Sequence, residues 1–304
     1  MRLGIDIGGT AVKMGIVDDA DRVIDSVAIP TDAERPVDAI LQDIAAAAKP
    51  LCDTYRPRFV GIGCPGRVNP EKGLVLRAGH LPFDNTPVVA VLSEALGLPA
   101  AIDNDANCAM LAEHAAGACA DKQDALMVTI GTGIGGAILI GGKLYRGFNF
   151  RAGELGHFIL DHQGRPCPCG LHGCFEQYAS ATALCEQAVA AADNAPDSLL
   201  AALIREQGIS GKTVFSAVEN GCPTAKAVLT RYGEYMAMGL NSFIKIFMPE
   251  CIVLAGGITK VGHPLSDVIT PHLLPEADLR LSTLGGDAGI LGAASLERLD
   301  TSRT

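Results

Sequence analysis

A strand–turn–strand pattern, with glycine and threonine in the turn, occurs twice in this sequence. In the first copy, the apolar run from Arg2 to Ile7 is followed by the turn Gly8-Gly9-Thr10 and by a segment to Ile16 in which every second residue is apolar. The second copy spans Leu126 to Ile140, and its second strand is expected from Ala137. Alternation with period two predicts strands, and repetition of a whole pattern predicts repeated structure. We therefore expect an α/β fold built from two β-β-β-α-β-α units with a central cleft.

Apolar periodicity places further elements around these two hairpins. The expected strands cover residues 23–29, 59–64, 100–102 and 251–254, and the expected helices begin near Pro36 and cover residues 87–96, 225–248 and 290–299. We expect an N-terminal lobe formed by residues 1–115 and 290–304, and a C-terminal lobe formed by residues 116–289.

Charge and hydropathy argue against several classes of function. The 304 residues include 24 Lys and Arg against 34 Asp and Glu, without a dense basic run, so the charge gives little support to a nucleic-acid surface or an anionic-membrane anchor. Glycines and threonines interrupt the longest apolar stretch, Leu126 to Gly142, so no membrane helix is predicted. The N-terminus lacks the basic and apolar segments of a secretory signal. We expect a cytoplasmic protein that binds a small molecule.

The first turn combines groups that suit a phosphate. Asp6 ends a strand, Gly8 and Gly9 offer backbone N–H groups, and Thr10 and Lys13 add a hydroxyl and a cation. Backbone N–H groups can bind phosphate oxygens, and a carboxylate can hold Mg²⁺ through water. A plain hairpin, with glycines for positive φ, explains the same residues equally well.

Two further glycine patterns resemble nucleotide-binding motifs only in part. Residues 131–136 match G-x-G-x-x-G, but a dinucleotide site requires a helix directly after the glycines, whereas a strand is expected here. A nicotinamide enzyme is therefore excluded. Gly211-Lys212-Thr213 resembles the end of a P-loop, but Glu206 stands where the first glycine must be, so we expect an ordinary loop.

Three consecutive polar residues, Asp103, Asn104 and Asp105, lie between a predicted strand and a predicted helix. Asn104-Asp105 is the best candidate for a general base, because phosphoryl transfer to an alcohol needs a carboxylate within hydrogen-bond reach of the attacking hydroxyl. Asp103 or Asn104 could instead cap the helix, which explains one of the three polar residues.

The cysteine cluster is the most specific signal in the chain. Cys167, Cys169 and Cys174 lie close together among glycines, a spacing that suits a tetrahedral, structural zinc ion with one imidazole as the fourth ligand. Spacing alone leaves His157, His162 and His172 as alternatives for that ligand, and buried thiols without a metal as a further alternative. The remaining cysteines lack such spacing and are expected to be reduced core residues.

Together these motifs resemble the ROK family of repressors and sugar kinases, within the actin-like ATPase (ribonuclease H-like) superfamily, across essentially the whole chain. The matching segments are Asp6 to Thr10, Gly63 to Gly66, Asn104 to Asn107, Ile130 to Gly136, Gly153 to His157, Cys167 to Glu176 and Ala255 to Gly257. The resemblance implies a two-lobed actin-like fold and an enzyme that uses ATP to phosphorylate the 6-hydroxyl of a hexose in the cleft.

The resemblance also implies roles for individual residues, with Asp105 as the base that takes the proton from the sugar. The implied sugar-binding residues are Gly66, Asn104, Asp105, Glu154, His157 and Glu176. Those implied around the ATP phosphates and Mg²⁺ are Asp6, Gly8, Gly9, Thr10, Lys13, Thr132 and Gly133, with Gly256 and Gly257 near the adenine. The implied zinc ligands are His157, Cys167, Cys169 and Cys174.

The sugar is less closely defined than the reaction. The segment from Cys174 to Thr182 resembles the glucokinase branch, so we expect glucose first and N-acetylmannosamine, N-acetylglucosamine or fructose second, in a homodimer that serves glycolysis. His80 lies where many family members carry Asn, and Ala255 lies where a third glycine is common. A sugar-responsive transcription regulator is the alternative outside enzymes. It would need a DNA-binding module before the first strand, and Met1 is only a few residues ahead of Asp6.

Overall fold

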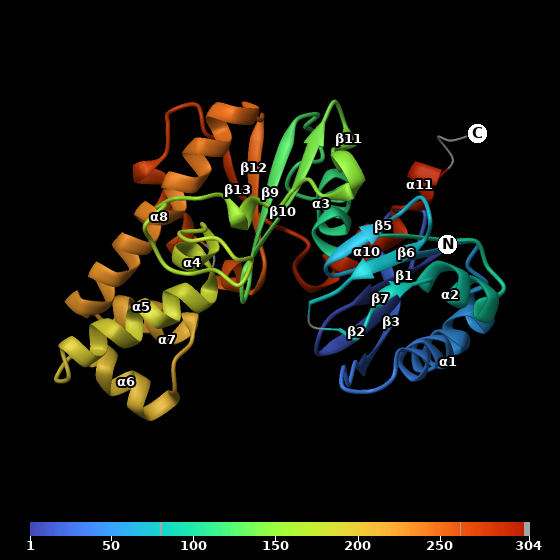
Figure 1. Ribbon diagram of the computed structural model, residues 1–304, viewed down its shortest axis with the longest axis horizontal. Helices are drawn as coiled ribbons and strands as arrows, with labels where there is room; N and C mark the ends of the chain where they lie inside the picture. Colours follow the sequence, from blue (N-terminus) through green and yellow to red (C-terminus); the bar gives the residue numbers. More distant parts are fainter. Residues whose placement is uncertain (80, 262, 301–304) are drawn as a thin grey trace. The chain divides into compact units, whose positions relative to one another are not determined.

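The computed structural model describes residues 1–79, 81–261 and 263–300, so His80 lies outside the described residues. The chain forms two compact units, and many of their elements are labelled in Figure 1. Unit 1 comprises Met1–Lys122, Ile138–Ala152 and the chain from Thr283 on, and unit 2 comprises Gln123–Ala137 and Gly153–Ser282. No helix within the described ranges is long and apolar enough to cross a membrane.

A five-stranded sheet with the order β3-β2-β1-β4-β8 forms the centre of unit 1. Its strands are β1 (Arg2–Ile7), β2 (Ala11–Val17), β3 (Val23–Pro30), β4 (Val60–Cys64) and β8 (Ala100–Asn104). β1 pairs with β2 in antiparallel fashion and with β4 in parallel, with Asp6 opposite Lys13 and Gly63. β4 pairs in parallel with β8, with Cys64 opposite Asn104. Asp6 and Asn104 therefore lie at the same edge of the sheet, where the parallel strands end.

Helices pack on this sheet and complete the core of unit 1. The helices that contact its strands are α1 (Val37–Tyr55), α2 (Val88–Leu96), α3 (Asp105–Ala116) and α10 (Ala288–Ala294). Unit 1 also contains the short helices η1 (Phe148–Phe150), η5 (Gly285–Asp287) and α11 (Glu297–Asp300). Buried side chains of β1, β4 and α1, such as Ile5, Ile62 and Ile40, belong to one apolar cluster. A Cβ at Gly61 would lie 1.7 Å from the backbone oxygen of Ala293, so glycine is required where α10 crosses the sheet. A small antiparallel sheet is formed by β5 (Arg67–Asn69), β6 (Leu74–Arg77) and β7 (Asp84–Thr86).

The second large sheet repeats the strand order of the first, which confirms the predicted duplication. Its order is β11-β10-β9-β12-β13, so in both sheets the third, second, first, fourth and fifth strands of the repeat are neighbours. The strands are β9 (Ala125–Ile130), β10 (Ile134–Ile140), β11 (Lys143–Leu144), β12 (Cys251–Ala255) and β13 (Leu279–Leu281). β10 begins at Ile134 rather than at Ala137, because the glycines 135 and 136 belong to the strand.

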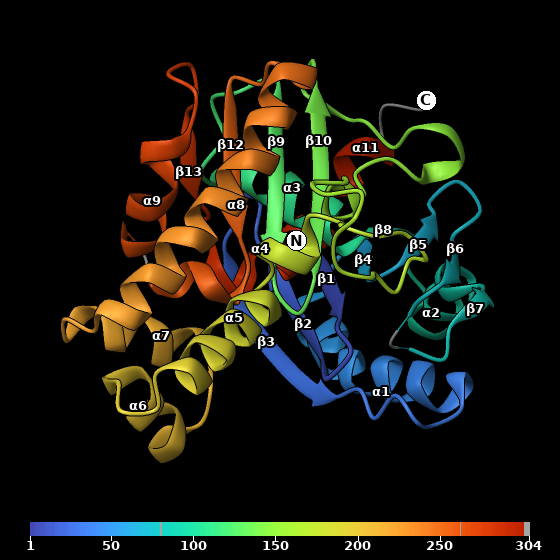
Figure 2. The ribbon, with the colours of Figure 1, turned by 60° about the vertical axis from the view of Figure 1, so that its left-hand side comes forward.

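Unit 2 is otherwise mostly helical. Its helices are η2 (Leu155–His157), α4 (Glu176–Ala179), α5 (Ala181–Asn194), α6 (Leu199–Gln207), α7 (Gly211–Glu219), α8 (Pro223–Phe247), η3 (Gly257–Val261), α9 (His263–Ile269) and η4 (Thr270–His272). α5, α6 and α7 gather near the N-terminal end of α8 (Figure 2).

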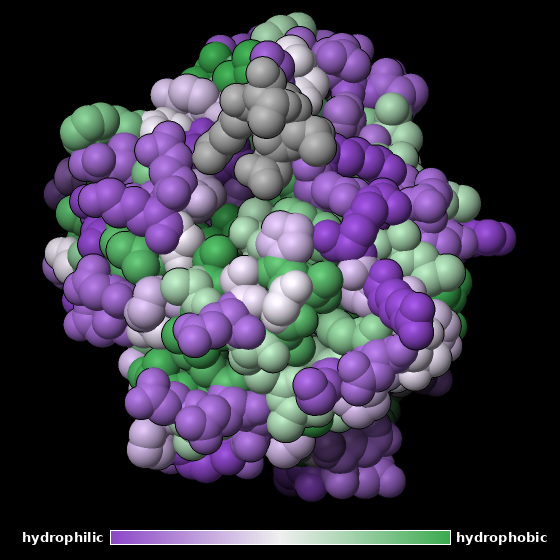
Figure 3. Space-filling view, turned by 90° about the vertical axis from the view of Figure 1, so that its right-hand side faces the viewer, coloured by the Kyte–Doolittle hydropathy of each residue, from purple (hydrophilic) through white to green (hydrophobic). Residues whose placement is uncertain are grey.

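Two local expectations were wrong. Gly211-Lys212-Thr213 begins α7 instead of forming a loop, because the Ser210 hydroxyl caps the helix by accepting a hydrogen bond from Thr213 N–H at 3.2 Å. The tail forms two short helices instead of one, and Ser295 lies between them. On the face shown in Figure 3, hydrophilic side chains surround apolar areas, as is usual for folded chains.

Candidate functional site

The turn from β8 into α3 holds the three consecutive polar residues. Asn104 caps α3, because its side-chain oxygen accepts hydrogen bonds from the N–H groups of Ala106 and Asn107 at 2.9 and 3.3 Å. Its amide nitrogen donates to the backbone oxygen of Gly66 at 3.1 Å. Capping therefore explains Asn104, and it leaves Asp105, at the first position of the helix, as the candidate base.

Two carboxyl groups of unit 1, Asp6 and Asp105, have raised pKa values. Burial and the negative charge of Asp105 raise the pKa of Asp6 to about 6, although the Lys13 ammonium lowers it. Burial also raises the pKa of Asp105 above the usual range, although hydrogen bonds from the backbone and from Asn104 lower it. The Asp105 side chain is still reached by solvent, so it is recessed rather than enclosed. An accessible carboxylate with a raised pKa is suited to accept a proton near neutral pH.

Position 66, whose backbone oxygen accepts the hydrogen bond from Asn104, favours glycine. Gly66 has a φ of +87°, and a Cβ there would lie 2.4 Å from the backbone oxygen of Arg77. This geometry holds the carbonyl group that accepts the hydrogen bond from Asn104.

The first glycine turn joins β1 to β2 next to Asp6. The backbone oxygen of Gly8 accepts a hydrogen bond from the Thr31 hydroxyl at 2.6 Å, while Gly9 and Thr10 are exposed. Lys13 is also exposed, with its ammonium 3.4 Å from the backbone oxygen of Gly286. Unit 1 thus brings the predicted phosphate turn and its cation to the sheet edge that carries Asp6.

Unit 2 brings together the other predicted nucleotide and sugar residues. Thr132 and Gly133 lie in the turn between β9 and β10, and the Glu176 carboxylate accepts a hydrogen bond from Ile134 N–H at 3.4 Å. A Cβ at Gly256, which precedes Gly257 after β12, would lie 2.3 Å from the backbone oxygen of Ile130. The turn after β9 and the turn after β12 therefore lie side by side, and Glu176 is next to the turn after β9.

The cysteine cluster has the geometry of a metal site. The ligand atoms of His157, Cys167, Cys169 and Cys174 all lie within 4.8 Å of one another. Cys169 Sγ and Cys174 Sγ are 3.5 Å apart, and Cys167 Sγ lies 3.7 Å from His157 Nδ1. Tetrahedral zinc, with Zn–S bonds of about 2.3 Å, separates its ligand atoms by roughly 3.5 to 3.8 Å. The residues therefore fit a closed Cys₃His zinc site, with His157 rather than His162 or His172 in the described group.

His157 connects this cluster to two predicted sugar-binding carboxylates. Its Nδ1 faces the thiols and lies 3.5 Å from Glu176 Oε1, while its Nε2 lies 4.0 Å from Glu154 Oε2. The Glu154 side chain is 70% exposed, so it can reach a ligand. An imidazole held at Nδ1 keeps a fixed ring orientation and leaves Nε2 for another partner.

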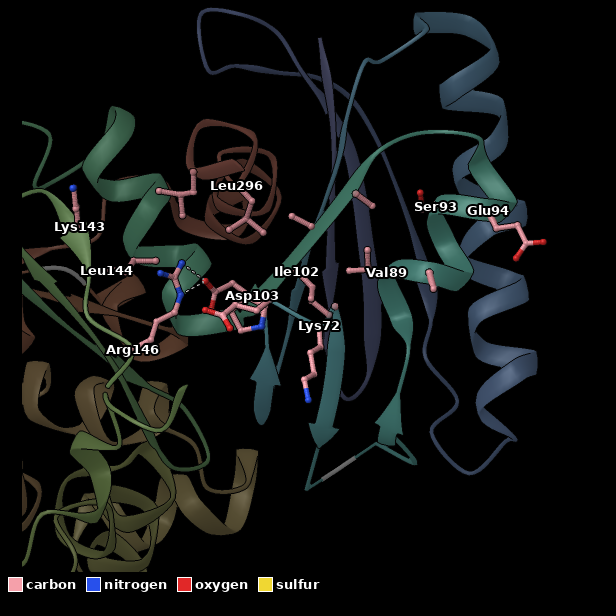
Figure 4. Close-up of a pocket in the computed structure, with 17 residues that line it drawn as sticks. Lys72, Val89, Ser93, Glu94, Ile102, Asp103, Lys143, Leu144, Arg146 and Leu296 are labelled. Carbon is pink, nitrogen blue, oxygen red and sulfur yellow. Dashed lines mark hydrogen bonds and ion pairs between the residues drawn. The ribbon is translucent and has the colours of Figure 1, made fainter. Parts of the chain in front are cut away.

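One ion pair beside the candidate base, between Arg146 and Asp103, has no signal in the sequence. Arg146, in the segment after β11, donates through Nε to the Asp103 carboxylate at 2.8 Å, and the two side chains point toward one another at the edge of a cavity (Figure 4). The sequence pattern indicates for Asp103 only a possible helix cap. Because Arg146 lies far along the chain and belongs to none of the motifs, no local signal could have paired them.

Comparisons with known proteins agree with the resemblance found in the sequence. A sequence model described as the ROK family matches residues 2–299. The chain is 33% identical to a glucokinase from Halalkalibacterium halodurans, over 97% of this chain and 94% of that protein. A crystal structure of a ROK family glucokinase from Streptomyces griseus, in complex with glucose and AMPPNP, has a TM-score of 0.85 at 32% identity and covers 98% of this chain and 99% of its own. A ROK family transcriptional regulator, a homologue of the E. coli MLC protein, has a TM-score of 0.87 at 27% identity, and the match covers 98% of this chain and 77% of the regulator.

Proposed function

The chain belongs to the ROK family, and from this membership we propose that it is an ATP-dependent sugar kinase that phosphorylates the 6-hydroxyl of a hexose. Glucose is the first candidate, because a full-length relative at 33% identity is a glucokinase and a solved relative is in complex with glucose and AMPPNP. One structural observation carries the proposal. Asp105 is an accessible carboxyl group with a raised pKa, fixed at the start of a helix beside Asn104.

Asp105 accepts the proton in the proposed reaction. The sugar 6-oxygen forms a bond to the γ-phosphorus of ATP, the bond between that phosphorus and the ADP oxygen breaks, and the hydroxyl proton passes to the Asp105 carboxylate. Phosphoryl transfer needs little covalent help from a protein, so holding the hydroxyl and the carboxylate within hydrogen-bond distance is the main task. The cap formed by Asn104 serves this task because it fixes the first turn of α3.

The glycine turns are assigned to the nucleotide. Their backbone N–H groups suit phosphate oxygens, and Thr10, Thr132 and Gly256 are exposed in the turns after β1, β9 and β12. Gly256 and Gly257 are assigned to the adenine side. Asp6 is suited to hold Mg²⁺ through water, and Mg²⁺ when bound offsets negative charge on the phosphates.

The sugar is assigned to the residues that the resemblance to the ROK family implies. The groups that these residues offer to hydroxyls are amide, carbonyl, carboxylate and imidazole groups, from Gly66, Asn104, Glu154, His157 and Glu176. The cysteine cluster has a structural role in this proposal, because a closed Cys₃His site has no open position for substrate. It would orient His157 so that Nε2 faces the sugar. The homodimer remains a prediction.

A panel of hexoses tests the proposed function. ADP release, measured in a coupled assay with ATP and Mg²⁺, should be fastest with glucose and slower with mannose, fructose, N-acetylglucosamine and N-acetylmannosamine. Faster turnover of an N-acetylhexosamine would support the proposed kinase activity but would replace glucose as the proposed substrate. A folded preparation with bound zinc that phosphorylates none of these sugars would contradict the proposal.

The similarity to a ROK transcriptional regulator favours a second candidate, a sugar-responsive DNA-binding function. The net charge of −10 argues against it, since DNA-binding surfaces are basic. Salt-sensitive binding in a gel-shift titration, combined with no kinase activity, would favour the regulator.

A further inference from the structure

Asp103 is a buried carboxylate whose acceptor positions are all used. Its side chain is only 2% exposed. One oxygen accepts hydrogen bonds from Asn104 N–H and from the Asn107 side-chain amide, both at 2.8 Å. The other oxygen accepts hydrogen bonds from Nε and Nη2 of Arg146. Two oxygens offer about four acceptor positions, so this carboxylate is saturated.

These contacts hold the backbone that carries the candidate base. Asn104 is the cap of α3 and Asp105 is its first residue, so the hydrogen bond that Asn104 N–H donates to Asp103 fixes the chain directly before Asp105. The hydrogen bond from Asn107 ties the same carboxylate to the first turn of α3. The buried Asp103 carboxylate therefore links the end of β8 to the first turn of α3.

Arg146 supplies the counter-charge, and it comes from a distant part of the chain. Its side chain is 23% exposed, and its backbone oxygen accepts a hydrogen bond from Ala152 N–H at 2.9 Å. That bond closes the loop directly before Gly153 and Glu154. A buried carboxylate without a counter-charge is strongly disfavoured, so loss of Arg146 would force Asp103 to move toward solvent or change its hydrogen bonds.

We propose that Arg146 is a positioning residue that acts through Asp103 to hold Asp105 in place for proton transfer. This inference rests on the proposed kinase function. Catalytic groups must be held close to their productive geometry, and a small displacement lowers the rate strongly. The hydrogen bonds of the Arg146 guanidinium go to Asp103, so in this proposal its loss should lower kcat while leaving ATP binding intact.

The cavity beside the pair makes the proposal testable by chemical rescue. A cavity of about 770 Å³ is lined by Arg146 and Asp103, by Lys143, and by Val89 and Ser93 of α2 (Figure 4). Truncation of Arg146 would enlarge this cavity at the carboxylate. A guanidinium ion is small enough to enter it and restore the missing charge and N–H donors.

The experiment compares Arg146→Ala with a matched buried arginine, Arg2→Ala. Arg2 is 2% exposed and pairs with Asp21 at 2.8 Å, but it lies at the opposite end of β1 from Asp6. We expect Arg146→Ala to lower kcat at least tenfold, to leave the KM for ATP within twofold, and to regain activity with millimolar guanidinium but not with sodium chloride. We expect Arg2→Ala to lower the unfolding temperature and to keep kcat within twofold.

Three results would overturn the proposal: an unchanged kcat in Arg146→Ala, a kcat that guanidinium does not raise, or an equal fall of kcat in Arg2→Ala. If Arg146→Ala does not fold, Asp103→Asn replaces it, because in either orientation of the new amide its nitrogen would face N–H donors. Its kcat should also fall at least tenfold, and a normal kcat would overturn the proposal. A wild-type chain without kinase activity would overturn the proposed function itself, whereas an active wild type with an equally active Arg146→Ala overturns only the role of Arg146.

Discussion

Replacing Asp6 with asparagine should stabilise the fold and abolish activity. Burial and the charge of Asp105 raise the pKa of Asp6 from 3.8 to about 6. An acid with a raised pKa is harder to ionise in the folded chain than in the unfolded chain. Ionised Asp6 therefore destabilises the fold, and this penalty grows as the pH rises from about 4 to about 6.

The pKa shift sets the magnitude of this effect. A shift of about two units corresponds to about 3 kcal/mol once the pH is well above 6. At pH 5 the same linkage gives about half of that value, and at pH 4 only about 0.5 kcal/mol. Asp6→Asn should therefore exceed the wild type in free energy of unfolding by about 3 kcal/mol at pH 8, and the gain should nearly vanish at pH 4. The variant should lose kinase activity because it lacks the carboxylate assigned to Mg²⁺.

Urea unfolding in magnesium-free buffer at pH 4, 5 and 8 measures this effect, and Asp21→Asn is a control of opposite sign. Burial would raise the pKa of Asp21, but hydrogen bonds and charges from Arg298 and Arg2 lower it. Ionised Asp21 therefore stabilises the fold at neutral pH, and this contribution is lost as the pH falls. Asp21→Asn should be less stable than the wild type at pH 8. A destabilised Asp6→Asn at pH 8, or a difference that does not depend on pH, would refute the reasoning.

Three further predictions concern the zinc cluster, a buried carboxylate and a glycine. Cys169→Ser should lower bound zinc, measured by elemental analysis, and should raise the KM for sugar more than the KM for ATP, because His157 would lose its fixed orientation; unchanged metal content would contradict the site. Glu113→Ala should lower the free energy of unfolding by about 3 kcal/mol or more, because fully buried Glu113 accepts hydrogen bonds from Ala118 N–H and Thr283 N–H; a change below 1 kcal/mol in urea unfolding would be inconsistent with this. Gly66→Ala should cost about 1 to 3 kcal/mol through its positive φ and should raise the KM for sugar, as steady-state kinetics and thermal unfolding can check.

Periodicity in the sequence was sufficient to predict most of the elements that carry the site. β1, β2 and β9 agree with the expected strands because alternating or continuous apolar residues reflect burial directly. The start of β10 was misplaced because Gly135 and Gly136 have no side chain that could show an alternating pattern. A Cβ at Gly136 would lie 2.5 Å from the Leu155 side chain, so close packing explains that glycine, and packing cannot be read from a sequence.

The metal cluster and the Arg146–Asp103 ion pair also depend on contacts that cannot be read from the sequence alone. The three cysteines are close in sequence, so their spacing predicted a metal site, but spacing alone did not decide among three histidines. The resemblance to the ROK family implied His157, and the fold places His157 Nδ1 beside Cys167. Arg146 and Asp103 are 43 residues apart, and only the tertiary structure brings them together. Contacts of this kind depend on loop geometry, which local patterns do not determine.

The role of Asp105 is tested most directly by the kcat of Asp105→Asn with glucose and ATP at saturation. Asparagine keeps the volume and polarity of the side chain but cannot accept the proton, so kcat should fall by about 10² to 10⁴ while zinc content is retained. Thermal stability at neutral pH should be retained or raised, because burial raises the pKa of Asp105 as it does that of Asp6. A kcat within tenfold of the wild type would contradict the assignment of Asp105 as the proton acceptor.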